Sequence, residues 1–317
     1  MKTMRLEKAE DGFAILTLDA EGSMNVVNDA FIADMEAATK QIVVDESIKG
    51  VILTSAKKTF MAGADLKQLV NGFGTLTPQE AYAFSKRATD MHRAIEQSGK
   101  PWVAAINGLA LGGGFELALA CHRRILADDA KAQVGLPEVN VGLLPGSGGT
   151  VRLGIIAGMK IALDLLLSGR SVGPQEALKL KIVDEVVPAD KLIDAAKAWL
   201  ATGPDPVKPW DVKGWTPPQK KGMTVPEDSA AYMMYTGGLA KGGYNQPAPA
   251  AILNSVFHGL QLPFDKALAV EGKYFAKLLT DPVARNIIRT TFISKQAAEK
   301  GARRPEGVPK SEVKKLG

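Results

Sequence analysis

Two carboxylates stand out because apolar residues and glycine surround each of them. Glu116 is the single charged residue in the segment LALGGGFELALAC, and Glu138 lies in QVGLPEVNVGLLPGSGG. A buried carboxylate without a partner is costly, so such groups are paired with a base or used in chemistry. Lys131 and Arg152, the strong bases nearest to Glu138 in the sequence, are not obvious partners. We therefore expect both glutamates to act on a substrate.

Two carboxylates in one water-poor cleft would repel each other. This repulsion holds one proton on the pair and allows one carboxyl group to act as an acid and the other as a base. The sequence thus indicates acid–base chemistry at Glu116 and Glu138.

Two glycine turns could supply hydrogen-bond donors for the same chemistry. Gly112 to Gly114 precede FELALA, which is a good helix start, so we expect a strand, a glycine turn and a helix N-terminus. In FMAGADLKQL, Gly63 turns the chain and leaves the N–H of Ala64 exposed. Each turn alone is more often an ordinary loop, but together they could form a two-donor oxyanion hole.

Strands alternate with helices around these motifs, which predicts an α/β domain up to about residue 203. Apolar, β-branched runs predict strands at 12–20, 49–56 and 101–110. Helical spacing after Asn28 and after Thr77, both good N-cap residues, predicts helices over 28–45 and 77–100.

The character of the sequence changes after residue 203. Prolines and tryptophans predict an irregular segment over 204–247, and helical patterns predict a small helical subdomain over 248–299. Residues 300–317 carry a net charge of +4 and read as an extended, solvated linker.

Composition excludes several classes of protein. The formal net charge is +5, and because most of it lies in the linker, the body is near neutral and no nucleic-acid partner is indicated. The longest apolar stretch, residues 102–121, contains Asn107 and Glu116, so we expect buried core and no transmembrane segment. The N-terminus lacks a signal-peptide pattern and there is one cysteine, so we expect a cytoplasmic protein. The three histidines have no metal-ligand spacing, so no metal is expected.

Three segments together resemble the enoyl-CoA hydratase/isomerase (crotonase) superfamily. They are TFMAGADLKQL, GLALGGGFELALACHRRI and AQVGLPEVNVGLLPGSGGTVRL, and the resemblance covers roughly residues 1–201. The remainder is similar to the hydratase half of multifunctional, alpha-subunit-type fatty-acid oxidation enzymes. In that family a lysine-rich stretch leads into a 3-hydroxyacyl-CoA dehydrogenase domain, and we expect one beyond this chain. The implied fold is an α/β, crotonase-like ββα spiral core followed by the helical subdomain.

The resemblance implies hydration of 2-trans-enoyl-CoA to 3-hydroxyacyl-CoA in fatty-acid β-oxidation. Glu116 would take a proton from a water that attacks C3, Glu138 would protonate C2, and the N–H groups of Ala64 and Gly113 would form the oxyanion hole. Coenzyme A enters as part of the substrate, no other cofactor is implied for this chain, and NAD belongs to the dehydrogenase domain alone.

The resemblance also implies contacts with the acyl-CoA thioester. The nucleotide is expected near MNVVN and AGADLK, a phosphate near Lys67 or Lys295, and the acyl chain near LLPG. The candidate substrate-binding residues are Asn25, Val26, Ala62, Asp65, Lys67, Gly112, Leu143, Pro145 and Gly146.

Other functions stay open. Relatives that lack one glutamate isomerise double bonds, decarboxylate or hydrolyse thioesters, and having both favours hydration with isomerisation as a side activity. A non-catalytic domain that binds acyl-CoA, or that assembles the dehydrogenase with a thiolase partner, is the alternative from another class. Acyl chain length and oligomeric state are not indicated by the sequence.

Overall fold

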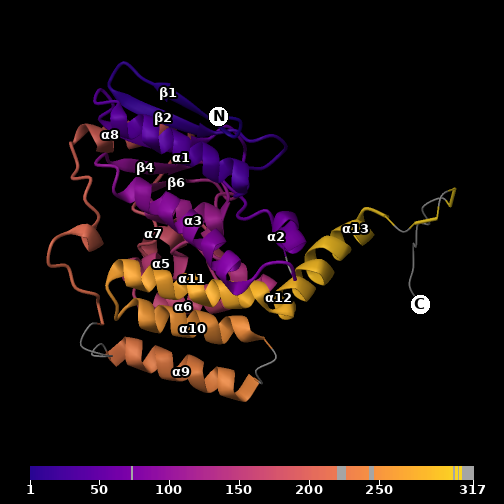
Figure 1. Cartoon of the computed structure of the whole chain (residues 1–317). Helices are drawn as coiled ribbons and strands as arrows, with labels where there is room; N and C mark the ends of the chain where they lie inside the picture. Colours follow the sequence, from indigo (N-terminus) through magenta and orange to yellow (C-terminus); the bar gives the residue numbers. More distant parts are fainter. Residues whose placement is uncertain (73, 220–225, 243–245, 303, 306, 309–317) are drawn as a thin grey trace.

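A six-stranded sheet forms the centre of the computed structural model, which describes residues 1–317 except 73, 220–225, 243–245, 303, 306 and 309–317 (Figure 1). The strand order is β1-β2-β3-β4-β6-β9, with β1 antiparallel to β2 and every other pair parallel. The strands are β1 (Met4–Lys8), β2 (Phe13–Leu18), β3 (Gly50–Ser55), β4 (Trp102–Ile106), β6 (Arg123–Ala127) and β9 (Glu185–Val187). The strands expected around residues 12–20 and 49–56 are therefore present, and the third ends earlier than expected.

Three shorter strands form a second sheet beside the first. They are β5 (Ala110–Leu111), β7 (Val134–Gly135) and β8 (Ser171–Val172), in the order β5-β7-β8. A parallel bridge between Met61 and Ala110 joins the segment after β3 to β5. This junction brings the two glycine turns of the sequence into one region.

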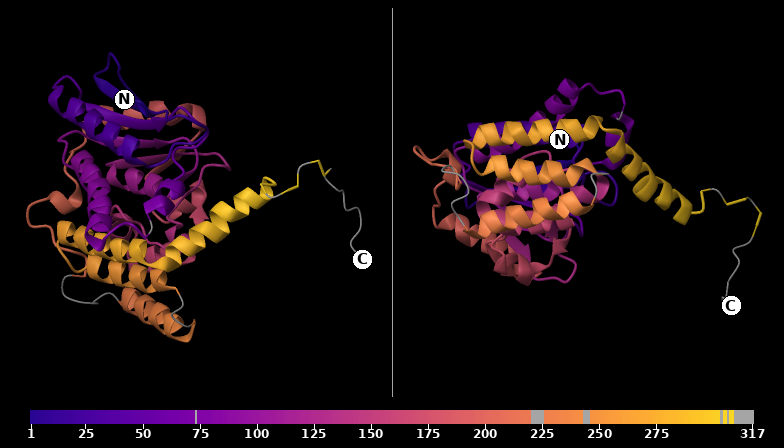
Figure 2. Two further views of the ribbon diagram at one scale, coloured as in Figure 1. Left: turned by 45° about the vertical axis from the view of Figure 1, so that its right-hand side comes forward. Right: turned by 90° about the horizontal axis from the view of Figure 1, so that it is seen from below.

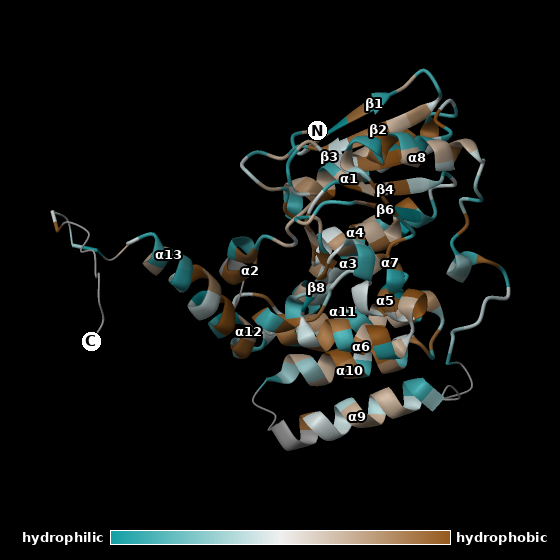
Figure 3. Ribbon diagram, turned by 180° about the vertical axis from the view of Figure 1, so that it is seen from behind, coloured by the Kyte–Doolittle hydropathy of each residue, from teal (hydrophilic) through white to brown (hydrophobic). Residues whose placement is uncertain are grey.

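Helices cover both faces of the large sheet, as an α/β fold requires. Helices α1 (Asp29–Val44) and α3 (Pro78–Glu96) pack together on one face, and α8 (Leu192–Ala201) packs on the other (Figures 1 and 3). The side chain of Asn28 accepts a hydrogen bond from the Phe31 N–H at 2.9 Å. Thr77 and Glu80 form a reciprocal capping box. The two predicted helix starts are therefore confirmed.

The remaining elements of the first 219 residues connect these layers. They are α2 (Leu66–Gly72), α4 (Gly113–Ala120), η1 (Glu138–Val141), α5 (Gly149–Ala157), α6 (Met159–Ser168), α7 (Pro174–Lys179), η2 (Ala189–Lys191) and η3 (Pro209–Asp211). None of the helices in the described ranges is long and apolar enough to cross a membrane.

The predicted C-terminal helices are present and share the main core. Helices α10 (Pro247–Gly259) and α11 (Phe264–Thr280) lie side by side, and α11 packs along α3 (Figure 2). Beyond them, α12 (Pro282–Ile287), η4 (Ile288–Ser294) and α13 (Lys295–Glu299) project from the body, with η4 against α2. The buried residues of α10 and the second half of α11 belong to the same apolar cluster as the sheet. At the start of α11, Phe264, Ala267 and Leu268 form a small second cluster with Val151 and Trp210.

The prediction of an irregular segment over 204–247 is wrong for its second half. Helix α9 (Pro226–Gly242) occupies it and packs on α6 and α10. Ala231 is buried, and Tyr232, Tyr235 and Leu239 contact the core at helical spacing. This packing stabilises the helix despite its Gly-Gly pair. Because glycine has a low helix propensity, the sequence pattern did not predict a helix here. The predicted linker at 300–317 falls largely outside the described residues.

The first half of that segment, residues 204–219, crosses the body of the protein, and we call it the strap. Lys208 and Trp210 fix it in place. The Trp210 ring stacks on Phe264 with centroids 4.5 Å apart. The Lys208 Nζ is buried and donates hydrogen bonds to the carbonyl oxygens of Cys121 at 2.7 Å and Leu119 at 3.4 Å. These carbonyls end helix α4, so a cation stands where the helix dipole favours one. Burial nevertheless lowers the pKa of Lys208 to about 7.

The buried lysine predicts a pH dependence of stability. Between about pH 7 and 10.5 the unfolded chain holds a proton at Lys208 that the folded chain has lost, so the free energy of unfolding rises with pH in this window. The slope from this group is at most about 1.4 kcal/mol per pH unit. Urea unfolding of Lys208→Met should lack this rise, whereas Lys213→Met, an exposed lysine of the same strap, should retain it. Equal slopes in all three proteins would contradict the assignment.

Candidate active site

Two glycine turns touch each other at the N-terminus of α4. Gly63 and Gly112 have φ values of +97° and +53°, which side chains other than glycine rarely adopt. A Cβ added to Gly63 would lie 3.1 Å from the Leu111 carbonyl oxygen, and one added to Gly112 would lie 3.7 Å from the Gly63 Cα. The two turns are therefore in van der Waals contact, and only glycine fits.

Each turn presents a backbone N–H group. In the parallel bridge to Val27, the Val27 N–H donates to the Gly63 carbonyl and the Asp65 N–H donates to the Val27 carbonyl, so the N–H of Ala64 points the other way. Gly113 is the first residue of α4 and has no preceding turn to bond to. Within the described part of the chain neither N–H has an acceptor. This is the arrangement that a two-donor oxyanion hole needs.

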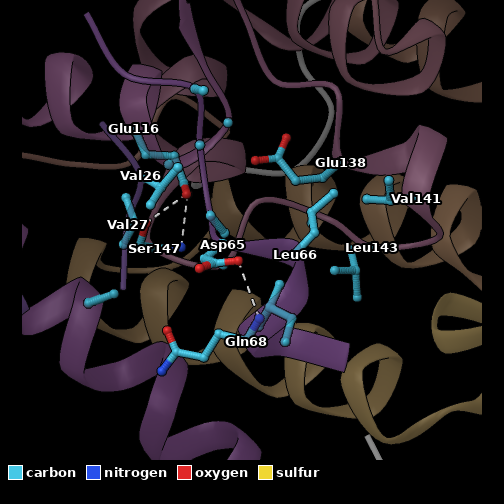
Figure 4. Close-up of a pocket in the computed structure, with 18 of the residues that line it drawn as sticks. Val26, Val27, Asp65, Leu66, Gln68, Glu116, Glu138, Val141, Leu143 and Ser147 are labelled. Atoms are coloured by element: carbon cyan, nitrogen blue, oxygen red, sulfur yellow. Dashed lines mark hydrogen bonds between the residues drawn. The ribbon is translucent and has the colours of Figure 1, made fainter. Parts of the chain in front are cut away.

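Glu116, on the first turn of α4, is 3% exposed and held by three hydrogen bonds. Its Oε1 accepts from the N–H groups of Ser147 and Gly149, both at 2.8 Å, and its Oε2 accepts from the Ser147 hydroxyl at 2.7 Å (Figure 4). Burial raises the pKa of Glu116, and these donors oppose the rise because they stabilise the charged form. The carboxylate is thus fixed in position.

Glu138 begins η1 and points across the cavity toward Glu116 (Figure 4). Its Oε2 is buried and has no hydrogen-bond partner in the described residues. Burial raises the pKa of Glu138 well above its ordinary value, and the charges of Glu116 and Glu271 add to the rise. Two carboxyl groups whose environments differ in this way suit one base, Glu116, and one acid, Glu138.

Arg152 forms its ion pair with Glu96, and its charge also lowers the pKa of Glu116. It is fully buried, and its Nε and Nη2 donate to the carboxylate of Glu96 at 2.7 and 3.0 Å. Its Nη1 donates to the Ser147 carbonyl oxygen at 2.9 Å. Arg152 therefore holds the backbone that positions Glu116.

Both carboxyl groups line a cavity of about 580 Å³. Residues from α1, α2, α3, α4, η1, α11 and η4 form its walls. The side chains deeper in the wall are mostly apolar, including Ile32, Phe84, Leu144 and Phe275. A cavity of this size and character accommodates an apolar chain with few polar contacts.

The structure gathers most of the candidate binding residues in this cavity. Its lining includes Val26, Ala62, Asp65, Lys67, Gly112, Leu143 and Gly146, together with Ala64 and Gly113. Asp65 also caps α2, because its Oδ1 accepts from the Lys67 N–H at 2.9 Å.

Three of the candidates are not in the lining. The amide of Asn25 is buried and bonds to Ser55 Oγ at 2.9 Å and the Phe60 carbonyl at 3.0 Å, so its side chain holds two loops together. Pro145 is buried behind the lining, against Gly149. Lys295 is exposed on α13 and is not among the lining residues, whereas its neighbour Gln296 is. These three residues lie outside the lining because adjacent residues in a turn or helix point in different directions, and their contact with a substrate stays a prediction.

Sequence reasoning missed Ser147 and the contributions of the C-terminal helices. Ser147 lies inside the motif PGSGG, where a serine is typical of an ordinary turn and does not indicate a function. Glu271 on α11 is 1% exposed and hydrogen-bonds the same loop, and Phe275 and Phe292 line the cavity. A glutamate in VEGKYF between apolar helix positions was a signal for Glu271.

Among the described residues, no group of three or more His, Cys, Asp and Glu side chains is arranged to hold a metal ion. His92 and His122 are instead engaged with backbone carbonyls, of Ser147 at 3.0 Å and of Pro206 at 2.6 Å.

Paired buried carboxyl groups beside a two-donor turn define a class of enzymes that stabilise an oxyanion and transfer protons. The model of the family "Enoyl-CoA hydratase/isomerase" matches residues 8–203. The chain belongs to this family, and its fold is the crotonase fold.

Relatives agree with this assignment. The chain is 37% identical to the fatty acid oxidation complex subunit alpha of Shewanella amazonensis, over 98% of this chain and 44% of that protein. It thus spans less than half of the curated relatives it matches. The structure of an enoyl-CoA hydratase from Bacillus anthracis is 25% identical, with a TM-score of 0.59 over 94% of this chain and 96% of that one. Human mitochondrial delta3-delta2-enoyl-CoA isomerase, 23% identical with a TM-score of 0.67 over 94% of this chain and 100% of that one, shares the fold.

The hydroxyl of Ser147 makes a testable contribution to Glu116. Because the Ser147 hydroxyl donates to the charged carboxylate, Ser147→Ala should raise the pKa of Glu116 further. Carbon-13 NMR of the glutamate carboxyl carbons across pH measures this. Ser168→Ala is the control, since the Ser168 hydroxyl donates to the Leu165 carbonyl oxygen on α6 and Ser168 does not line the cavity. A pKa of Glu116 that is unchanged or lower in Ser147→Ala would refute the role of the hydroxyl.

Proposed function

We propose that this chain is an enoyl-CoA hydratase, which adds water to the C2–C3 double bond of 2-trans-enoyl-CoA and forms 3-hydroxyacyl-CoA. One observation carries the proposal. Two carboxyl groups with raised pKa values, Glu116 buried and Glu138 half-buried, face one cavity. Its wall also presents the N–H groups of Ala64 and Gly113, which have no acceptor among the described residues.

The two N–H groups would bind the thioester carbonyl oxygen. As water attacks C3, electrons move through C2 to this oxygen, and enolate charge develops there. Donors already in place stabilise that charge by about 3–4 kcal/mol for a critical donor. The N-terminus of α4 adds the positive end of a helix dipole at the same point.

Proton transfers complete the reaction. Glu116, the base, takes a proton from the water as its oxygen bonds to C3. Glu138, the acid, gives its proton to C2 as the enolate collapses to the thioester. The net change is the addition of one water, and the proton now on Glu116 returns to Glu138 before the next turnover. Each positioned group is worth about 10²–10⁴-fold in rate.

The cavity supports an acyl-CoA substrate. Its apolar walls suit the acyl chain, while Lys67 and Gln296 at its lining offer polar groups to the CoA portion. The chemistry uses only side chains and backbone, so coenzyme A is needed solely as part of the substrate.

Isomerisation of 3-enoyl-CoA is the second candidate. The family and the shared fold include isomerases. Isomerisation needs one group to carry a proton between C4 and C2, whereas hydration needs an acid and a base on one water. The presence of both Glu116 and Glu138, with the pKa of Glu138 raised well above its ordinary value and that of Glu116 opposed by three hydrogen-bond donors, favours hydration.

The setting would be fatty-acid β-oxidation in the cytoplasm, as part of a larger assembly. The relatives are named fatty acid oxidation complex subunit alpha, and this chain matches 44% of one of them. A 3-hydroxyacyl-CoA dehydrogenase domain that uses NAD, and a thiolase partner, would then consume the product.

Assays of the two glutamates test the proposal. The absorbance of the conjugated enoyl thioester should fall rapidly when the chain is mixed with crotonyl-CoA or a medium-chain 2-enoyl-CoA. Glu116→Gln and Glu138→Gln should each slow this by at least about 100-fold, because each removes a proton-transfer group. Glu227→Gln, an exposed carboxyl change on α9, should not. A parallel sample with NAD should form no NADH.

The alternatives predict different outcomes. Unchanged hydration in Glu138→Gln would refute its role as the acid. Conversion of 3-enoyl-CoA without hydration of 2-enoyl-CoA would make the chain an isomerase. Tight binding of acyl-CoA with no turnover at any chain length would support the non-catalytic role.

A further inference from the structure

Residues 146–150 comprise the turn before α5 and its first two residues, and we call this segment the 146–150 loop. Two buried carboxyl groups hold it by binding alternating N–H groups. Glu116 accepts from the N–H groups of Ser147 and Gly149. Glu271 accepts from those of Gly148 and of Thr150, the latter at 2.8 Å. The side chain of Glu116 comes from α4 and that of Glu271 from α11, more than a hundred residues away in sequence. Every N–H from residue 147 to residue 150 is thus bound by one of these two carboxyl groups.

The other contacts of the loop are also buried. The Ser85 hydroxyl donates to the Gly146 carbonyl, and Arg152 and His92 contact the Ser147 carbonyl. The hydroxyl of Thr150 lies between the Glu271 carboxyl group and Ser255 Oγ, so it links α11 to α10. Gly148 adopts a φ of +103°, which lets successive N–H groups face opposite sides.

We propose that Glu271 is a positioning residue for hydration: by binding the N–H groups of Gly148 and Thr150 it fixes the loop whose other two N–H groups hold Glu116. This inference rests on the proposed function and extends it to the C-terminal helices. Glu271 does not touch the reacting atoms, because the loop lies between it and Glu116. It acts on the base through the backbone.

Glu271 could act on Glu116 through its negative charge or through its hydrogen bonds to the loop, so the titratable groups around it matter. The charges of Glu116 on α4 and Glu138 on η1 interact with that of Glu271. Arg152 on α5 and His92 on α3 bond to the Ser147 carbonyl oxygen of the same loop, and His92 is neutral above its pKa of about 4. Burial and the charge of Glu116 raise the pKa of Glu271 to about 8. Glutamine carries no charge, so a lost charge and lost hydrogen bonds would move the pKa of Glu116 in opposite directions, and the sign of the change separates the two.

Glutamine keeps the size of the side chain but has one acceptor oxygen, so it cannot accept from both Gly148 and Thr150. In Glu271→Gln the loop should shift, and the hydrogen bonds to Glu116 should lengthen. Since those bonds favour the ionised form, the pKa of Glu116 should rise. The acid limb of the kcat profile should therefore move to higher pH, by about 0.5–1 unit. Loss of a negative charge would move it to lower pH instead.

The experiment compares the unaltered chain, Glu271→Gln and Glu227→Gln with crotonyl-CoA across pH. We expect kcat of Glu271→Gln to fall about 10- to 100-fold, as for a base displaced by a fraction of an ångström to an ångström. The KM, and the Kd for butyryl-CoA, which has no double bond to hydrate, should change less than about threefold. Hydrogen exchange of the segment 146–150 should accelerate in Glu271→Gln and not in Glu227→Gln.

A fall in kcat with an unmoved acid limb and unchanged exchange would overturn the proposal and leave Glu271 a structural residue. The same holds if the melting temperature falls while kcat per folded molecule is preserved. If the unaltered chain hydrates no 2-enoyl-CoA, the proposed function fails. Carbon-13 NMR of the Glu116 carboxyl group then decides the positioning role, which requires a raised pKa in Glu271→Gln and is refuted by an unchanged one.

Discussion

The burial of the Glu116 carboxylate is the interaction on which the site depends. A charge in an apolar wall persists only if donors replace its lost water, and here two N–H groups and a hydroxyl of the 146–150 loop do so. The backbone of that loop must then be held in turn. Arg152 and Glu96 anchor its carbonyl side, and Glu271 binds its other N–H groups. A single functional carboxylate thus requires a buried polar network spread over α3, α4, α5 and α11.

The two sheets position the pair of N–H donors on the other side of the site. The parallel bridges of Val27 with Ala64 and Met61 with Ala110 bring two turns into contact, and glycine at Gly63 and Gly112 lets the backbones approach. Two N–H groups from distant segments are left without acceptors among the residues that the structure describes. Donors fixed by a sheet need not reorganise during the reaction, which is why backbone groups serve well at such positions.

The C-terminal helices are part of this active site. They share the apolar cluster of the main domain, α11 supplies Glu271, and Phe275 and Phe292 complete the cavity wall. The strap around Lys208 and Trp210 crosses the body to reach them and binds the C-terminal end of α4. The helix that carries Glu116 is therefore supported at its C-terminal end by the strap and, through the 146–150 loop, by α11.

The sequence by itself determined the α/β core, the capped helices α1 and α3, and the pairing of Glu116 and Glu138 with two glycine turns. These follow from local rules: periodicity, cap residues, and the cost of an unpaired carboxylate in apolar surroundings. Tertiary structure alone decided which neighbours face the cavity, so Asn25 and Pro145 turned away from it and Ser147 and Glu271 entered the network. It also decided that α9 is helical, because packing on α6 and α10 offsets its glycines. Side-chain direction and long-range packing depend on contacts between segments far apart in the chain, which no local pattern encodes.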